Sequence, residues 1–301
     1  MQLNLGVILH ESASTRPDRV AVRLEERTLS YAELDRQARI IATGLREIGI
    51  APGQTVAVLI PNVPEFTMSY FGILYAGCTV VPINVLLSAP EITYHLQDSE
   101  AKVLIAHPFF AESAREGASA AAVPVIWSNG EGDDSLEAMT SLPPLANLHP
   151  TLPTDTAVVL YTSGTTGKPK GAELTHSNLF LNCSVVVPRL IPAEEELVMI
   201  ATLPLFHSFG QTAVQNVSIS AGGIVTMLPR FTPEDALRIM ERDRVTTFAG
   251  VPTMYFALLH HEFEREYDLS ALKNCMSGGA PMPLEVMKAF EKKYGVEILE
   301  G

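Results

Sequence analysis

Short apolar runs alternate along the chain with segments of helical length, and this alternation limits the folds open to it. Residues 56–60, 79–82 and 103–106 are short runs dominated by apolar residues, several of them β-branched. Runs of this kind are typical of strands buried on both faces, as in parallel sheets. Helices are expected between them, at 64–75 and 90–97. Strands that alternate with helices predict an α/β fold built on parallel sheets.

A polar segment at residues 129–153 interrupts this pattern. It is rich in Gly, Asp, Ser, Pro and Asn and has no periodicity, which is typical of loops and linkers. Beyond it we expect further strands at 157–161, 246–249, 274–276 and 296–299. The sequence therefore predicts two α/β portions, approximately 1–150 and 151–301, joined by a loop near 129–153.

Composition indicates a folded, acidic protein. Hydrophobic residues make up 47% of the 301 residues and charged residues 18%, enough for a sizeable core. With 21 basic against 34 acidic residues the net charge is −13, which disfavours a nucleic-acid partner. The three cysteines are far apart and lack CxxC spacing. We therefore expect neither a disulfide framework nor a zinc site, and a reduced, cytoplasmic setting.

Two stretches without Asp, Glu, Lys or Arg, residues 66–90 and 197–229, are long enough to span a bilayer, which takes about 20 residues. Glycines, prolines and polar residues break each of them into pieces of helix, turn and strand length. We interpret both as buried α/β core, with peripheral membrane contact as the open alternative. Residues 1–14 lack the basic and apolar regions of a signal peptide.

The clearest chemical signal is the segment YTSGTTGKPKG at residues 161–171, directly after a predicted strand. Its glycines permit positive φ and close approach to a ligand, and its hydroxyls and lysines are phosphate-binding groups. It is not a Walker A loop, because two residues rather than four separate Gly164 and Gly167, and Pro169 follows Lys168. The segment predicts a polyphosphate-binding loop of another kind.

This loop resembles the phosphate loop of the adenylate-forming superfamily: acyl-CoA synthetases, aryl-CoA ligases, firefly luciferase and nonribosomal adenylation domains. Three further segments resemble motifs of that family in the same order: LPLFHSFG at 203–210, SGGAP at 277–281 and LEG at 299–301. The resemblance spans essentially the whole chain. It implies that residues 1–301 form part of the large N-terminal domain, with parallel-sheet α/β subdomains packed together and the C-terminal domain absent.

The resemblance also implies roles for single residues. His207, Lys168 and Thr165 would act in catalysis, with His207 beside the acyl carboxylate. Arg230 would contact the nucleotide part of CoA. The ATP phosphates would be held by Thr162, Ser163, Gly164, Thr165, Thr166, Gly167, Lys168 and Lys170. The adenine and the acyl-adenylate would lie against Gly278, Gly279, Ala280, Glu300 and Gly301. The acid would contact His207, Phe209, Gln211, Val214 and Val251.

The implied reaction has two steps. A carboxylate oxygen attacks the α-phosphorus of ATP to give acyl-adenylate and pyrophosphate, and the thiol of CoA then displaces AMP. The expected cofactors are ATP, Mg²⁺ and CoA as co-substrate. The family's Mg²⁺ ligand and catalytic lysine are expected beyond Gly301, so we assign no metal ligand here and expect the 301-residue chain alone to be inactive.

The expected pocket region is apolar, which favours a long- or medium-chain fatty acid as substrate; its residues are Leu205, Phe206, Phe209, Val251 and Met254. An aryl acid or another carboxylate is the alternative within the family. A third possibility is that the chain acts only as a non-catalytic nucleotide- or acyl-binding module. The expected partners are a small carboxylic acid, ATP and CoA, and a homodimer stays open. Residues 210–220 are expected to form a helix that begins at the acid.

Overall fold

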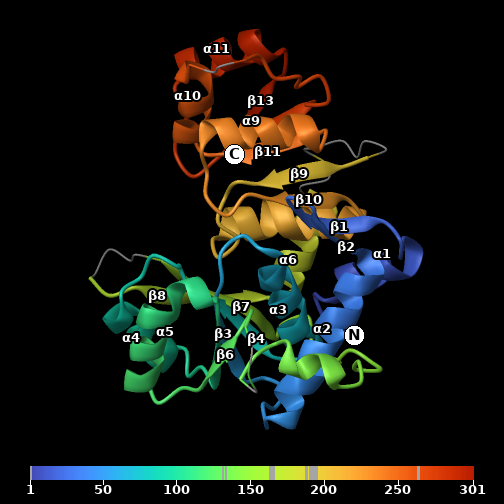
Figure 1. Ribbon diagram of the computed structural model, residues 1–301, viewed down its shortest axis with the longest axis vertical. Helices are drawn as coiled ribbons and strands as arrows, with labels where there is room; N and C mark the ends of the chain where they lie inside the picture. Colours follow the sequence, from blue (N-terminus) through green and yellow to red (C-terminus); the bar gives the residue numbers. More distant parts are fainter. Residues whose placement is uncertain are drawn as a thin grey trace. The chain divides into compact units, whose positions relative to one another are not determined.

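The computed structural model describes residues 2–130, 132, 134–162, 167–186, 189, 196–262 and 265–301. The chain forms two compact units, each built around one β-sheet (Figure 1). Unit 1 comprises Met1–Pro17, Tyr31–Pro61 and Glu65–Asn182, and unit 2 comprises Asp18–Ser30, Asn62–Pro64 and Cys183–Gly301.

The sheet of unit 1 has the strand order β6-β5-β3-β4-β7-β8. All neighbouring strands are parallel except β8, which is antiparallel to β7. The strands are β3 (Thr55–Leu59), β4 (Thr79–Pro82), β5 (Val103–Ala106), β6 (Val125–Trp127), β7 (Thr156–Thr162) and β8 (Lys170–Thr175). The helices are α1 (Val7–Thr15), α2 (Tyr31–Glu47), α3 (Pro64–Tyr75), α4 (Ala89–Asp98), α5 (Ala111–Ala120) and α6 (His176–Leu181), with 3₁₀ turns η1 (Pro108–Phe110) and η2 (Ala138–Ser141).

Helices α4 and α5 cover one face of this sheet and lie side by side (Figure 1). Leu59, Ile83 and Leu104 from the sheet region pack with Ile92 of α4, and all four are fully buried. Gly117 of α5 permits this approach, because a Cβ there would lie 2.8 Å from Cγ2 of Ile92. Burial on both faces explains why β3, β4 and β5 are short, mainly apolar runs.

The sheet of unit 2 has the order β13-β12-β11-β9-β10-β1-β2, and only the β1–β2 hairpin is antiparallel. The strands are β1 (Val20–Leu24), β2 (Arg27–Ser30), β9 (Val198–Ala201), β10 (Ile224–Met227), β11 (Thr247–Gly250), β12 (Asn274–Ser277) and β13 (Ile298–Glu300). The helices are α8 (Val217–Ala221), α9 (Pro233–Arg242), α10 (Pro252–His260) and α11 (Leu284–Tyr294), with π-helical segments η3 (Asn182–Val186) and η4 (Gly210–Asn216).

A buried carboxylate ties α9 to two strands of this sheet. Asp243, at the end of α9, accepts hydrogen bonds from Arg23 of β1 and Arg242, both at 2.9 Å, and from Thr226 of β10 at 2.5 Å. Burial raises the pKa of Asp243, but these three donors outweigh it and hold that pKa below its ordinary value. The carboxylate therefore stays charged and paired.

The predicted α/β fold with parallel sheets is confirmed. The strands expected at 79–82 and 103–106 and the helix at 64–75 have the expected bounds. The uncharged stretch 66–90 divides into most of α3, β4 and the start of α4, and 197–229 into β9, η4, α8 and β10, as the interpretation as buried core requires. In the described part of the chain no helix is both long and apolar enough to cross a membrane.

The predicted division near 129–153 is not the one that the compact units follow, because this segment lies inside unit 1. Arg39 of α2 donates to the carbonyl oxygens of Leu145 and Ala146, and the Thr43 hydroxyl donates to that of Pro143. The composition indicated a loop correctly, but side chains of α2 hold its backbone. The chain passes between the units elsewhere, finally at Asn182/Cys183.

Candidate functional site

The predicted phosphate loop is the turn of the β7–β8 hairpin, in unit 1. Thr162 pairs with Lys170 at the end of the ladder. Because β7 is parallel to β4, Thr162 lies at the carboxyl edge of the sheet, where parallel sheets bind ligands. Gly167 has a φ of 102°, a conformation that favours glycine. Four predicted phosphate ligands lie outside the described residues: Ser163, Gly164, Thr165 and Thr166.

The two lysines of the loop stand on its descending arm, and both are exposed. The Lys168 Nζ lies 5.5 Å from the ring centre of Tyr94 in α4. The Tyr94 hydroxyl donates to the carbonyl oxygen of Pro169 at 2.8 Å. Two exposed ammonium groups next to a glycine turn are groups that can bind phosphoryl oxygens.

An aromatic cluster that the sequence analysis did not assign supports the hairpin. The Tyr161 hydroxyl, on β7, donates to Asp98 of α4 at 2.7 Å, and the Tyr161 ring lies 4.2 Å from that of His95. Burial, followed by the contact with Asp98, raises the pKa of Tyr161 above its ordinary value. Tyr161 therefore stays protonated and donates. The only signal in the sequence was the Tyr-His pair on a predicted helix.

The topology of unit 2 brings the other predicted segments to one edge of its sheet. Strands β9 to β13 are parallel, and each candidate segment follows the carboxyl end of one of them. Residues 203–211 follow β9, Arg230 follows β10, Val251 follows β11, residues 278–280 follow β12 and Gly301 follows β13. The carboxyl edge is where ligands of parallel sheets bind.

Close contacts join four of these segments. A Cβ on Gly278 would lie 3.0 Å from the ring of Phe209 and 3.0 Å from the carbonyl oxygen of Gly301. Gly279 has a φ of 80°, and Val251 lies 3.5 Å from the place of its Cβ. The structure thus brings Phe209, Val251, Gly278, Gly279 and Gly301 together. Glycine at 278 is what lets the aromatic ring and the end of β13 approach the loop.

Glu300 acts on this loop through the backbone. Its Oε1 accepts a hydrogen bond from the N–H of Met282 at 2.7 Å, and the N–H of Gly301 donates to the carbonyl of Ser277 at 3.0 Å. Ala280 between them is exposed. The Glu300 carboxylate braces the loop after β12.

The turn before His207 is held by Asn62, which the sequence analysis missed. The Asn62 amide donates to the carbonyls of Ala201 and Leu203 at 2.8 and 2.9 Å, and its Oδ1 accepts from the N–H of Leu205 at 2.9 Å. Asn62 is 4% exposed, whereas the side chain of His207 is exposed. The one available signal was a single polar residue between an apolar run and Pro64.

The helix expected at 210–220 is present, but its first seven residues are π-helical. Gln211 and Val214 are 0% exposed. The Gln211 Nε2 donates weakly to the carbonyl of Leu205 at 3.4 Å, and its Oε1 has no partner among the described residues. π-Helical turns occur frequently at functional sites, and a buried polar atom without a partner needs an explanation.

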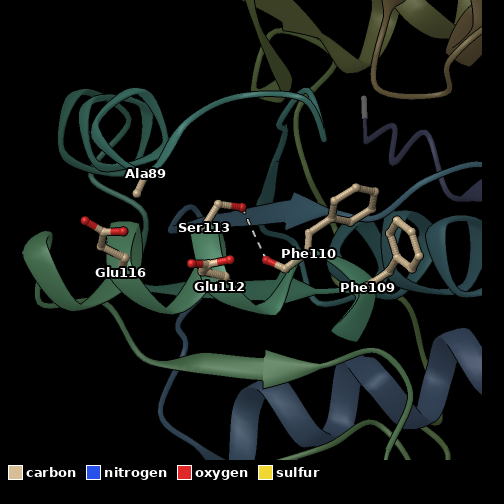
Figure 2. Close-up of a pocket in the computed structure, with 6 residues that line it drawn as sticks. All are labelled: Ala89, Phe109, Phe110, Glu112, Ser113 and Glu116. Atoms are coloured by element: carbon tan, nitrogen blue, oxygen red, sulfur yellow. Dashed lines mark hydrogen bonds between the residues drawn. The ribbon is translucent and has the colours of Figure 1, made fainter.

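Two hollows open in unit 1, and the larger one reaches both ends of the predicted phosphate-binding segment, Tyr161 and Gly171. One, of ≈ 300 Å³, is lined by Ala89, Phe109, Phe110, Glu112, Ser113 and Glu116 (Figure 2). The other, of ≈ 650 Å³, contains Tyr161, Gly171 and Glu173 in its wall. Across the described residues, no three His, Cys, Asp or Glu side chains are grouped so that they could hold a metal ion.

Comparison with known proteins shows the family to which this chain is similar. The family model for AMP-binding enzymes matches residues 9–301. A long-chain-fatty-acid–CoA ligase of Bacillus subtilis is 34% identical over 99% of this chain and 59% of that protein. A feruloyl-CoA synthase of an Amycolatopsis species is 38% identical over 96% of this chain and 57% of that protein.

A solved structure is similar throughout the chain. The anthranilate CoA ligase in complex with anthranoyl-AMP superimposes with a TM-score of 0.94 and 25% identity, covering 100% of this chain and 59% of that one. The chain thus spans 57% to 59% of the length of these three proteins.

Proposed function

Because the chain belongs to the family of AMP-binding enzymes, the adenylate-forming superfamily that its motifs resemble, we propose that the whole protein is an acid–thiol ligase. It activates a carboxylic acid with ATP and transfers the acyl group to CoA. The observation that carries the proposal is the glycine- and lysine-rich β7–β8 turn at a carboxyl sheet edge, where exposed ammonium groups can bind a triphosphate.

In the proposed first step, a carboxylate oxygen attacks the α-phosphorus of ATP and pyrophosphate leaves. Lys168 and Lys170 stabilise the phosphoryl oxygens, and backbone N–H groups near Gly167 add further donors. The loop offers no nucleophile of its own, which fits a reaction that depends on positioning and charge. Mg²⁺ bound with the nucleotide would neutralise part of the charge on the phosphoryl oxygens.

Residues at the carboxyl edge of unit 2 are assigned to the acid and the nucleotide. His207 would orient the acid carboxylate, with Phe209 and Val251 as apolar wall. Gly278, Gly279 and Gly301 leave backbone free for the acyl-adenylate, and Glu300 keeps their loop in place. In the second step the CoA thiol attacks the acyl carbon and AMP leaves. Arg230, exposed after β10, is assigned to the CoA nucleotide.

We propose a long- or medium-chain fatty acid as the substrate. The support is the apolar wall formed by Phe209 and Val251, together with the similarity to the fatty-acid ligase of Bacillus subtilis. No basic or acidic residue lies among the residues assigned to the acyl chain.

A specific observation favours a second candidate, an aryl acid that carries a hydroxyl or amino group. Among the described residues no donor reaches the buried Oε1 of Gln211, and an unsatisfied buried acceptor costs about 1–3 kcal/mol. A phenol or aniline N–H could satisfy it. The feruloyl-CoA synthase and the anthranilate CoA ligase are named for acids of this kind.

The test is acid-dependent ATP–pyrophosphate exchange by the full-length protein with octanoate, palmitate, ferulate and benzoate. Exchange with at least one acid, followed by thioester formation on addition of CoA, is expected. The 301-residue chain alone is expected to bind ATP but to release pyrophosphate only at background rate, as a nucleotide-binding module. Absence of exchange with every acid would contradict the proposed ligase activity.

A further inference from the structure

Tyr94 of α4 contacts both arms of the hairpin that carries the phosphate loop. On the descending arm, its hydroxyl donates to the carbonyl oxygen of Pro169 at 2.8 Å. On the ascending arm, its ring meets that of Tyr161 edge-on, with 6.3 Å between the ring centres. Tyr94, 75 positions before Pro169, thus contacts both strands of the hairpin next to the loop.

The bond to Pro169 fixes more than one carbonyl. Proline restricts its own φ and disfavours the helical region for the residue before it. Holding the Pro169 carbonyl therefore also limits the backbone directions open to Lys168. The Lys168 ammonium lies 5.5 Å from the centre of the Tyr94 ring, a distance at which a cation is attracted to an aromatic face.

The proton of Tyr94 is free to serve Pro169. Asp98, one turn further along α4, accepts the hydroxyl of Tyr161 at its Oδ2 at 2.7 Å, whereas its Oδ1 lies 3.4 Å from the Tyr94 hydroxyl. A hydroxyl has one proton to donate, and the shorter partner of Tyr94 is the carbonyl of Pro169.

Helix α4 is a rigid base for these contacts. Its first turn is closed by a capping box between Ser88 and Glu91. Its apolar face packs into the core of unit 1 through Ile92 and Leu96, both at most 1% exposed. Tyr94 lies half-buried between these anchors and the loop.

We propose that Tyr94 is a positioning residue for the phosphate loop. Its hydroxyl holds the descending arm at Pro169, and its ring keeps Lys168 beside the loop until the phosphate groups of a nucleotide take up the ammonium. The second half of this statement rests on the proposed function, whereas the first half concerns the free chain alone.

Three variants of the 301-residue chain separate these roles. Tyr94→Phe removes the bond to Pro169 and keeps the ring, and Tyr94→Leu removes both. Tyr294→Phe is the matched control, because it removes the same kind of bond, from a tyrosine hydroxyl to a backbone carbonyl, at Leu258 in unit 2. Thermal unfolding verifies that each variant is folded, and Tyr94→Phe keeps the test decisive should Tyr94→Leu not fold.

Hydrogen exchange of the free chain tests the anchoring. We expect amides 167, 168, 170 and 171 to exchange about two- to tenfold faster in Tyr94→Phe, the effect of one hydrogen bond. The same amides should exchange close to the wild-type rate in Tyr294→Phe. Wild-type exchange at these amides in both Tyr94 variants would overturn the proposal.

Titration with ATP and with AMP tests the effect on the ligand. The Kd for ATP should rise about two- to tenfold in Tyr94→Phe and a further two- to fivefold, roughly, in Tyr94→Leu, which also loses the ring. The Kd for AMP should stay unchanged, which a merely destabilised fold would not produce. Equal increases for both nucleotides would refute a role at the β- and γ-phosphates, which AMP lacks. Failure of the wild-type chain to bind either nucleotide would count against the proposed function, while the exchange rates still decide the anchoring.

Discussion

The phosphate hairpin of unit 1 and the carboxyl edge of unit 2 are built in different ways. The hairpin turn is one contiguous segment between two paired strands. The unit 2 edge collects residues that follow five strands between Val198 and Glu300, together with Asn62 from far upstream. The function of a contiguous segment can be predicted from its composition. A site formed by residues from several strands exists only in the folded chain. Substitutions should therefore act on binding in the first region and on stability in the second.

The largest effect is expected at Asn62, in the collected site. Asn62→Ala leaves the carbonyls of Ala201 and Leu203 and the N–H of Leu205 without these bonds in a buried turn. We expect the free energy of unfolding to fall by about 3–5 kcal/mol, since each buried group left unpaired costs roughly 1–3 kcal/mol. Urea unfolding of the chain measures it.

Asn84→Ala is the matched control, because Asn84 makes one exposed hydrogen bond to the N–H of Leu86. Its effect should stay below about 1 kcal/mol. Equal losses in the two variants would show that Asn62 does not hold the turn before His207.

The next largest effect is a dependence of stability on pH. It tests whether the β7–β8 hairpin depends on a contact with a distant segment, the bond between His176 and Leu5. His176, directly after β8, accepts a hydrogen bond from the N–H of Leu5 at its Nδ1, and burial lowers its pKa to about 4. Between pH 6.5 and 4 the unfolded chain binds the proton and the folded chain does not. The free energy of unfolding should therefore decrease as the pH is lowered from 6.5 to 4, by up to about 3 kcal/mol.

The measurement is the unfolding free energy as a function of pH for the wild type and for His176→Asn. The variant should lose most of the difference between pH 7 and pH 4, whereas His260→Gln, a change at an exposed histidine, should keep it. An unchanged pH profile in His176→Asn would assign the acid sensitivity to other groups.

The same contrast explains what the sequence could predict. Strands β4 and β5 were located correctly because burial on both faces leaves a continuous apolar run. Strand β8 was missed because four of its six residues are exposed and follow no apolar pattern; its pairing with β7 makes it a strand. The π-helical start of η4 also has no signature in residue spacing.

Candidate residues could be predicted from the sequence where they belong to a contiguous motif. The residues that hold these motifs in place could not. Asn62 acts on a turn about 140 residues further along the chain, and Tyr94 on a loop 75 residues away. A single polar residue that bonds to a distant backbone carbonyl leaves no periodic trace. Only the topology shows that Val251, Gly278 and Gly301 meet at one edge.

A smaller effect, confined to binding, is expected at the hairpin. Lys168→Ala removes an exposed ammonium that lies 5.5 Å from the centre of the Tyr94 ring. The free energy of unfolding should therefore change by no more than about 0.5 kcal/mol. The affinity for ATP should fall by roughly 1.5–3 kcal/mol, the range of a hydrogen bond to a charged group. Calorimetric titration with ATP checks this, and Lys273→Ala, at an exposed lysine outside the hairpin, is the control. A large fall in melting temperature at unchanged ATP affinity would make the hairpin structural.

The smallest effect separates the two candidate acids, and it concerns Gln211. Gln211→Leu replaces a buried amide that makes one long bond, 3.4 Å to Leu205, by an apolar side chain of similar size. If a hydroxylated aryl acid satisfies the free Oε1, ferulate should lose about 1–2 kcal/mol in kcat/KM relative to an analogue without the hydroxyl, the worth of one hydrogen bond. If the acid is a fatty acid, palmitate should keep or gain activity, because a buried acceptor that it cannot satisfy has been removed. The full-length protein assayed with both acids decides between them. Equal losses for ferulate and palmitate would place Gln211 outside the acid site, and the π-helical turn would then owe its buried amide to the fold of unit 2 alone.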